Sequence, residues 1–219
     1  MLIKKYSYKS QVYNNIKEGI ITGLYHQGEV LNERNLAKDL GISRTPVREA
    51  LQLLNKDGWV VIEPYKGALV RTFDEEYIKN VLDVRRPLEI LAVKKAALNA
   101  TEEDIKFLEN NLLLQEKCFE NYSPAKFMNL DREFHRKTYN LTYNELLIDI
   151  LDNINDIIRF LGIQVLKLPE RHKTTLEEHT NIYLAIKNKD VEEAKNYMDI
   201  HMIETAKHTL SQVTTKGSA

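Results

Sequence analysis

The chain has 219 residues, of which 43% are hydrophobic and 29% are charged, as is ordinary for a soluble globular protein. No run reaches the roughly 20 apolar residues of a membrane-spanning helix, and Met1–Tyr6 lacks the apolar core of a signal peptide. The single cysteine, Cys118, excludes an internal disulfide and is expected to be a small core residue. We therefore expect a cytoplasmic protein with no membrane segment.

Charge is distributed unevenly, although the formal net charge is only −1. Residues 1–73 hold eleven Lys and Arg against seven Asp and Glu, a net charge of +4, so the remainder carries −5. A basic part beside an acidic one favours a nucleic-acid-binding module joined to a second domain. We expect a DNA-binding domain at 1–73, a helical domain at 74–213 and a disordered tail at 214–219.

Apolar residues recur at helical spacing near the N-terminus. Val12, Ile16 and Ile20 repeat every four residues and predict an amphipathic helix. Asn32 is a suitable N-cap for a second, short helix, and Gly41 can adopt the positive φ that ends it. This arrangement predicts two helices before a tight turn.

A third helix is predicted directly after that turn. Ser43 or Thr45 can cap it, and Pro46 lies in its first turn, where a missing N–H has no consequence. Arg44 and Arg48 are then directed outward near its N-terminus. The pattern predicts a helix-turn-helix that presents arginines to a DNA major groove. An ordinary helical hairpin with solvated charges is the alternative, and the flanking sequence argues against it.

Two short β-branched runs follow, at 59–62 and 68–70, around a turn that contains Gly67. They predict a β-hairpin, or wing, directly after the helix-turn-helix. Arginines can bind guanine or phosphate, whereas Ser43 and Thr45 are expected to contact phosphate or cap the helix. The residues expected to contact DNA are Arg34, Ser43, Arg44, Thr45, Arg48, Lys66 and Gly67.

The N-terminal part resembles the GntR family of bacterial transcription regulators over about residues 8–72. The resemblance is carried by Gly28–Arg34, Leu36-Ala37, Ser43–Leu51, Gly58 and Gly67, while Gln27 replaces the family's usual proline. It implies a winged helix that binds double-stranded operator DNA. The positions it assigns to operator contact are Arg34, Arg44, Thr45, Arg48 and Gly67.

From residue 74 onward the apolar pattern is helical, with six predicted helices and short connections. This pattern predicts an antiparallel all-α bundle. We expect Pro87 to kink the first helix, the second to end near Glu120 and the last to end near Val213. The expected helix starts are Asp74, Thr101, Ser123, Asn144, Glu170 and Asp190.

Four residues of this bundle form a candidate metal site. Asp131 and His135 are four residues apart and share a helix face, and His179 and His201 lie among apolar residues on later helices. One carboxylate and three imidazoles suit Zn²⁺ or Ni²⁺, and Mn²⁺ is possible. Each histidine taken alone is equally explained as a satisfied core or surface residue.

The bundle resembles the FCD ligand-binding domain of the FadR-like branch of GntR regulators. The matching motifs are Asp83–Glu89, Asp131–His135, Asn144, Glu178-His179 and His201-Met202. The resemblance implies a divalent metal, zinc in the first place, held by Asp131, His135, His179 and His201. It also implies a small carboxylate effector that completes the coordination sphere.

Three further residues are candidates for binding that effector. Arg85 can form a bidentate pair with a carboxylate, although an ion pair with Glu89 one turn away competes for it. Arg159 is a second candidate, and Asn144 occupies a motif position.

Together these features predict a homodimeric transcription regulator, with repression as the expected mode, that binds a palindromic operator under effector control. A metal-sensing regulator is one alternative. A metal-dependent hydrolase or lyase fused to a DNA-binding head is another, because such a metal could activate water. No general base beside the site, nucleophile motif or phosphate-binding loop supports the enzyme, so we expect none.

Overall fold

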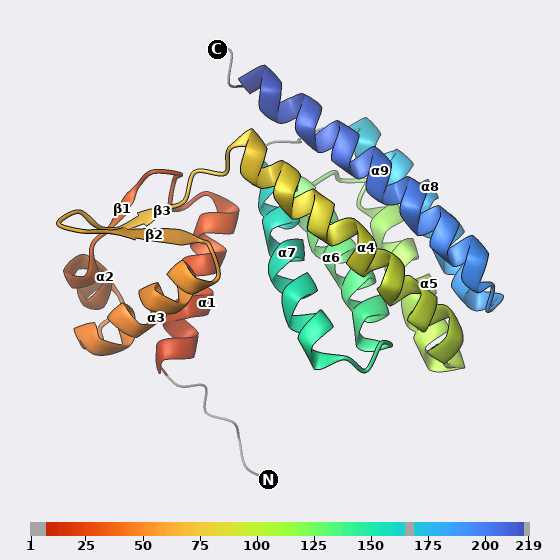
Figure 1. The fold of residues 1–219 in the computed structure, drawn as a ribbon, viewed down its shortest axis with the longest axis horizontal. Coiled ribbons are helices and arrows are strands. Elements are labelled where there is room, and N and C mark those ends of the chain that lie inside the picture. Colours follow the sequence, from red (N-terminus) through yellow and green to blue (C-terminus); the bar gives the residue numbers. More distant parts are fainter. Residues whose placement is uncertain (1–7, 165–168, 217–219) are drawn as a thin grey trace, which may run out of the picture. The chain divides into compact units, whose positions relative to one another are not determined.

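The computed structural model describes residues 8–164 and 169–216 and divides into two compact units, Met1–Phe73 and Asp74–Ala219. Figure 1 shows helices with one small sheet, and this mainly α fold confirms the predicted class. None of the described helices combines the length and apolarity that a bilayer crossing requires. The last helix runs to Lys216, three residues past the expected end, and 217–219 lie outside the described residues.

The first unit is a winged helix. Its sheet is antiparallel with strand order β1-β3-β2. The short first strand was not predicted, and it forms because Val30 pairs with Leu69 of the wing. The elements are α1 (Tyr8–Thr22), β1 (Val30–Leu31), α2 (Glu33–Asp39), α3 (Arg44–Lys56), β2 (Val60–Glu63) and β3 (Gly67–Val70).

Local sequence explains the geometry of this unit. The Asn32 side chain accepts hydrogen bonds from the backbone N–H groups of Arg34 and Asn35, which fixes the start of α2. Gly41 has φ +65°, so the chain turns sharply into α3. Trp59 is completely buried and contacts Phe73 edge-on at 5.7 Å, anchoring the wing to the helices.

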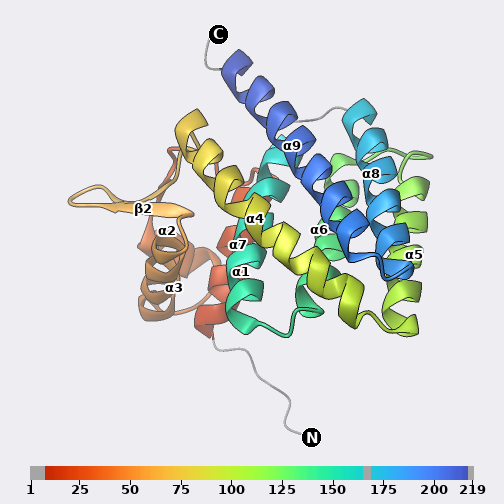
Figure 2. The same ribbon diagram turned by 45° about the vertical axis from the view of Figure 1, so that its right-hand side comes forward.

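The second unit contains six helices among its described residues. Figures 1 and 2 show α4 and α9 running antiparallel and side by side. Further packing pairs are α6 with α7, α8 with α9, and α5 with both α6 and α8. The helices are α4 (Glu75–Asn99), α5 (Glu102–Lys117), α6 (Pro124–Asn140), α7 (Glu145–Gln164), α8 (Pro169–Lys187) and α9 (Val191–Lys216).

The helix boundaries follow capping chemistry. Thr101 and Asp104 form a reciprocal capping box at the start of α5. That helix ends at Lys117, short of the expected Glu120, and the buried Cys118 is its C-cap. Pro87 lies inside α4, which is assigned as one helix on both sides of it.

Candidate functional site

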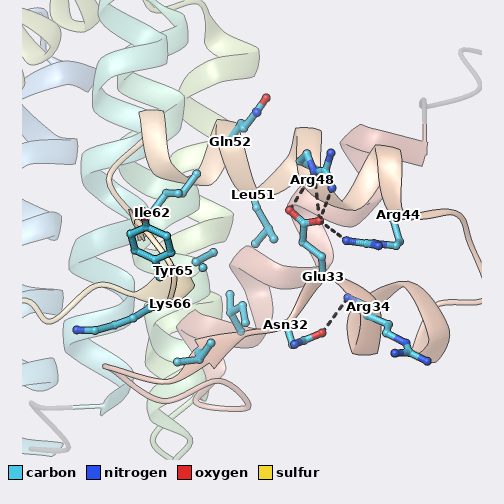
Figure 3. A pocket seen from close by; sticks show the side chains of 14 residues that line it. Asn32, Glu33, Arg34, Arg44, Arg48, Leu51, Gln52, Ile62, Tyr65 and Lys66 are labelled. Atoms are coloured by element: carbon cyan, nitrogen blue, oxygen red, sulfur yellow. Dashed lines mark hydrogen bonds and ion pairs between the residues drawn. The ribbon is translucent and has the colours of Figure 1, made fainter.

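The winged helix contains a groove of about 530 Å³ between α2, the start of α3 and the wing. Figure 3 shows Arg34, Arg44, Arg48 and Lys66 around it, contributed by three different elements. Gly67 also lines the groove. The fold therefore gathers five of the seven residues predicted to contact DNA on one surface.

Ser43 and Thr45 lie beside this groove without lining it. Ser43 is the N-cap of α3 by its backbone angles, but its side chain makes no capping hydrogen bond. Both side chains are exposed at the helix N-terminus. A helix N-terminus attracts anions through its free N–H groups and dipole, so the position suits a phosphate contact.

Glu33 is a residue of the groove that the sequence reasoning did not single out. Its carboxylate accepts hydrogen bonds from Nε and Nη2 of Arg48 at 3.0–3.2 Å and from Nη2 of Arg44 at 3.5 Å (Figure 3). The bonds from Arg48 hold the pKa of Glu33 below its ordinary value. Because the pairs are largely solvent-exposed, they are weak enough for the arginines to exchange Glu33 for DNA.

The bundle brings the predicted metal ligands together. His135 on α6, His179 on α8 and His201 on α9 are buried, and their ligand atoms lie within 4.8 Å of one another. Nε2 of His201 lies 3.2 Å from Nε2 of His135. Oδ1 of Asp131 lies 3.6 Å from Nε2 of His179, which adds the carboxylate to the cluster.

Each imidazole is anchored from behind through Nδ1. The acceptors are Oε2 of Glu89 for His135 at 3.1 Å, Oε1 of Gln115 for His179 at 3.1 Å, and Oε2 of Glu178 for His201 at 2.6 Å. A proton on each Nδ1 leaves the Nε2 lone pair directed to the centre. Such anchoring partners orient the histidines of metal sites and raise their basicity.

The donor set fits a divalent metal ion. Nε2 of His179 is buried without a hydrogen-bond partner among the described residues, an arrangement that is unfavourable unless something binds it. Burial and the neighbouring His201 and His135 hold the pKa of His179 well below its ordinary value. The ring is therefore neutral at physiological pH, as a metal ligand must be.

Arg85 lies next to this cluster, on α4, and is only 1% exposed. Its Nε donates to Oε1 of Glu89 at 3.0 Å, so the competing ion pair is present. Nη1 nevertheless has no partner among the described residues, and a buried guanidinium N–H without an acceptor is the geometry expected for anion binding.

Glu89 connects the arginine and the metal cluster. Besides Arg85 and His135, the hydroxyl of Tyr139 donates to it at 2.6 Å. Burial raises the pKa of the Glu89 carboxyl, but the charges of His135 and Arg85 outweigh burial and hold it at about 2. Glu89 is thus a buried anion at neutral pH, and sequence reasoning considered it only as a competitor for Arg85.

A cavity of about 30 Å³ adjoins the cluster, lined in part by Arg85, Asp131 and His201. It also exposes Arg171, His172, Thr205 and Thr209 from α8 and α9. No periodic or spacing signal in the sequence marked these four residues as neighbours of the metal cluster.

Two residues predicted to bind the effector lie elsewhere. Asn144 is exposed and caps α7, its Oδ1 accepting the backbone N–H of Leu147 at 3.1 Å. Nε of Arg159 donates to Oδ1 of Asn129 at 2.5 Å, and Arg159 does not line the cavity. The structure brings neither residue to the histidine cluster, so both assignments are corrected.

Comparison with known proteins accounts for both units. The family described as bacterial regulatory proteins, gntR family, matches residues 8–70, and the FCD domain matches residues 80–204. These two matches separate the DNA-binding unit from the helical bundle in the same order along the chain.

The relatives are full-length regulators. The chain is 34% identical to the Bacillus subtilis HTH-type transcriptional regulator YdhC, with 96% of each chain covered. It is 27% identical to the Escherichia coli HTH-type transcriptional repressor RspR, with 89% of this chain and 85% of RspR covered. The structure of E. coli McbR/YncC superposes with a TM-score of 0.83 at 24% identity, over 94% of this chain and 98% of McbR. The chain therefore belongs to the GntR family of bacterial transcriptional regulators, with an FCD domain after its winged helix, and its relatives are regulators and not enzymes.

Proposed function

We propose that this regulator represses transcription from its operator and that a small carboxylate, bound at a metal in the FCD domain, controls its affinity for DNA. The observation that carries the proposal is the convergence of three anchored imidazoles and Asp131 next to the unpartnered Nη1 of Arg85. The similarity to RspR, which is described as a repressor, supports the mode of action.

The groove of the winged helix is the proposed operator-binding surface. Arg44 and Arg48 project from the first turns of α3 toward base edges, and Lys66 and Gly67 of the wing approach the backbone or minor groove. Arg48→Ala is expected to weaken operator binding roughly 10- to 100-fold without changing metal content. Unchanged affinity in a mobility-shift titration would remove Arg48 from the contact surface.

The metal would be held by Asp131, His135, His179 and His201, with zinc first and nickel or manganese as alternatives. When bound, it supplies positive charge and an open coordination position for a carboxylate oxygen. Arg85 would orient the same carboxylate through Nη1. Combined His179→Ala and His201→Ala substitutions are expected to abolish bound metal in elemental analysis, and full retention would refute this ligand set.

We also propose a homodimer, which would place two winged helices on a palindromic operator. Val84, Leu91 and Leu98 lie seven residues apart on α4 and are 51%, 43% and 58% exposed. Ile200 and Ile203 on the neighbouring α9 are 53% and 43% exposed. An apolar surface of this extent on adjacent helices is suited to a second copy of the bundle.

One titration tests regulation by a carboxylate. Operator affinity is measured after chelation, after metal is restored, and after a panel of short organic acids is added to metal-loaded protein. The proposal expects the acids to shift affinity only in the metal-loaded state. A response to metal alone would identify a metal sensor, and turnover of any acid would identify an enzyme.

A further inference from the structure

We propose that the cavity beside the histidine cluster, defined by Arg85, His172 and Thr209, selects a short carboxylate that carries a hydroxyl group. The hydroxyl would bind Thr209 while the carboxylate binds Arg85 and the metal. This inference rests on the proposed function, because it assumes that a carboxylate binds at the metal.

Thr209 supplies the first observation. It is 1% exposed and lines the cavity, and its Oγ1 is buried without a hydrogen-bond partner among the described residues. Other helical threonines of this unit donate to their own helix, as Thr175 does to the carbonyl of Arg171 and Thr180 to that of Leu176. Thr209 makes no such bond. A buried hydroxyl without a partner is unfavourable, so it is a place for a ligand atom.

Arg85 supplies a second, independent observation. Its Nη1 is buried and unpartnered in the described structure, and it lines the same cavity from α4 while Thr209 lines it from α9. The guanidinium takes an anion, whereas a hydroxyl both donates and accepts and so suits a neutral polar group. One molecule with both groups would satisfy both orphaned atoms.

The other groups of the cavity favour a neutral second group over a second carboxylate. Both Nη atoms of Arg171 are already bonded to Glu178, at 2.7 and 2.9 Å. Burial lowers the pKa of His172 to about 4, so its ring is neutral at physiological pH. His208, which is 42% exposed, has Glu204 at 3.9 Å. A second anion would therefore gain little electrostatic compensation, and a hydroxyl needs none.

Volume limits the length of the ligand. The cavity of about 30 Å³ corresponds to roughly one water molecule, and Phe127, Met128 and Ile158 form its apolar wall. With the carboxylate at the metal, this space holds a hydroxyl and at most about one further carbon. Acids of two or three carbons fit this description.

The test compares pairs of acids that differ by one hydroxyl. Calorimetry on zinc-loaded protein measures glycolate against acetate, and each enantiomer of lactate against propionate. We expect at least one hydroxy acid to bind about tenfold more tightly than its deoxy partner. Thr209→Val keeps the shape of the side chain and is expected to remove this preference while leaving acetate affinity unchanged.

Two further variants keep the outcome interpretable. Thr209→Ser restores a hydroxyl and is expected to restore the preference, and Thr180→Val, whose hydroxyl bonds its own helix, is expected to retain it. Equal affinities within both pairs for the wild type, or a preference that survives in Thr209→Val, would overturn the inference and leave the carboxylate site standing. If none of the acids bound to zinc-loaded protein, the proposed function would fail as well.

Discussion

Replacing Glu89 with glutamine tests whether the bundle centre depends on one buried anion. Glu89 is completely buried and accepts hydrogen bonds from Arg85, His135 and Tyr139 at 3.0, 3.1 and 2.6 Å. Glutamine has nearly the same size but carries no charge. The change therefore leaves the Arg85 guanidinium buried without its counter-charge and weakens the anchor of His135.

The size of the effect can be worked from the structure in two ways. The pKa of Glu89 lies at about 2 instead of 4.5, which corresponds to about 3 kcal/mol of folding free energy at neutral pH. Because this pKa is lowered, the contribution is present above pH 4.5 and is lost as the pH falls from 4.5 toward 2. Removing one partner of a buried ion pair generally costs about 3–5 kcal/mol, in agreement.

Urea denaturation at pH 7 measures this loss, and metal titration measures the weakened anchor, with an expected roughly 10- to 100-fold fall in affinity. The matched control is Asp199→Asn, which removes the exposed pair between Arg86 and Asp199 at 2.6 and 2.9 Å. That control should lose less than about 1 kcal/mol. Equal losses for the two variants, or unchanged metal affinity in Glu89→Gln, would refute the reasoning.

Three other changes have defined outcomes. Glu33→Gln removes the acid that pairs with Arg48, so non-specific DNA binding should tighten and operator preference should fall, and binding isotherms at several salt concentrations would expose an unchanged ratio. His172→Phe keeps the stacking on Phe127 at 4.3 Å. Since the pKa of His172 is lowered to about 4, wild-type stability should fall by about 3 kcal/mol from pH 6.5 to 4, and urea midpoints of metal-stripped protein should show a shallower decline in the variant, an identical slope being contrary. Leu91→Glu should yield monomers in light scattering, and a persistent dimer would place the interface elsewhere.

The fold could be predicted largely because its signals are local. Asn32, Thr101 and Ser123 each accept the hydrogen bonds of an N-cap, as their positions before apolar repeats suggested. The strand Val30–Leu31 could not be predicted, because two residues carry no periodic pattern and the strand exists only through pairing with Leu69 and Ala68.

The site was predictable in its ligands and not in their surroundings. Asp131 and His135 are neighbours on one helix, so their spacing alone places them together. Gln115 lies 64 residues from His179 on another helix, and no local pattern links them. Asn144 shows the opposite error, since the same residue type is a common N-cap, and capping is the role that the structure gives it.

Glu89 also explains how metal and effector can influence each other without direct contact. It holds His135 through Oε2 and Arg85 through Oε1, so the proposed metal ligand and the proposed carboxylate ligand share one counter-charge. A metal on His135 would draw Glu89 toward the imidazole and leave Arg85 more strongly cationic toward a carboxylate. By linkage, a carboxylate that binds Arg85 would raise metal affinity by the same factor. Such coupling requires both ends of Glu89, and it is therefore expected to vanish in Glu89→Gln even where that variant still binds each ligand alone.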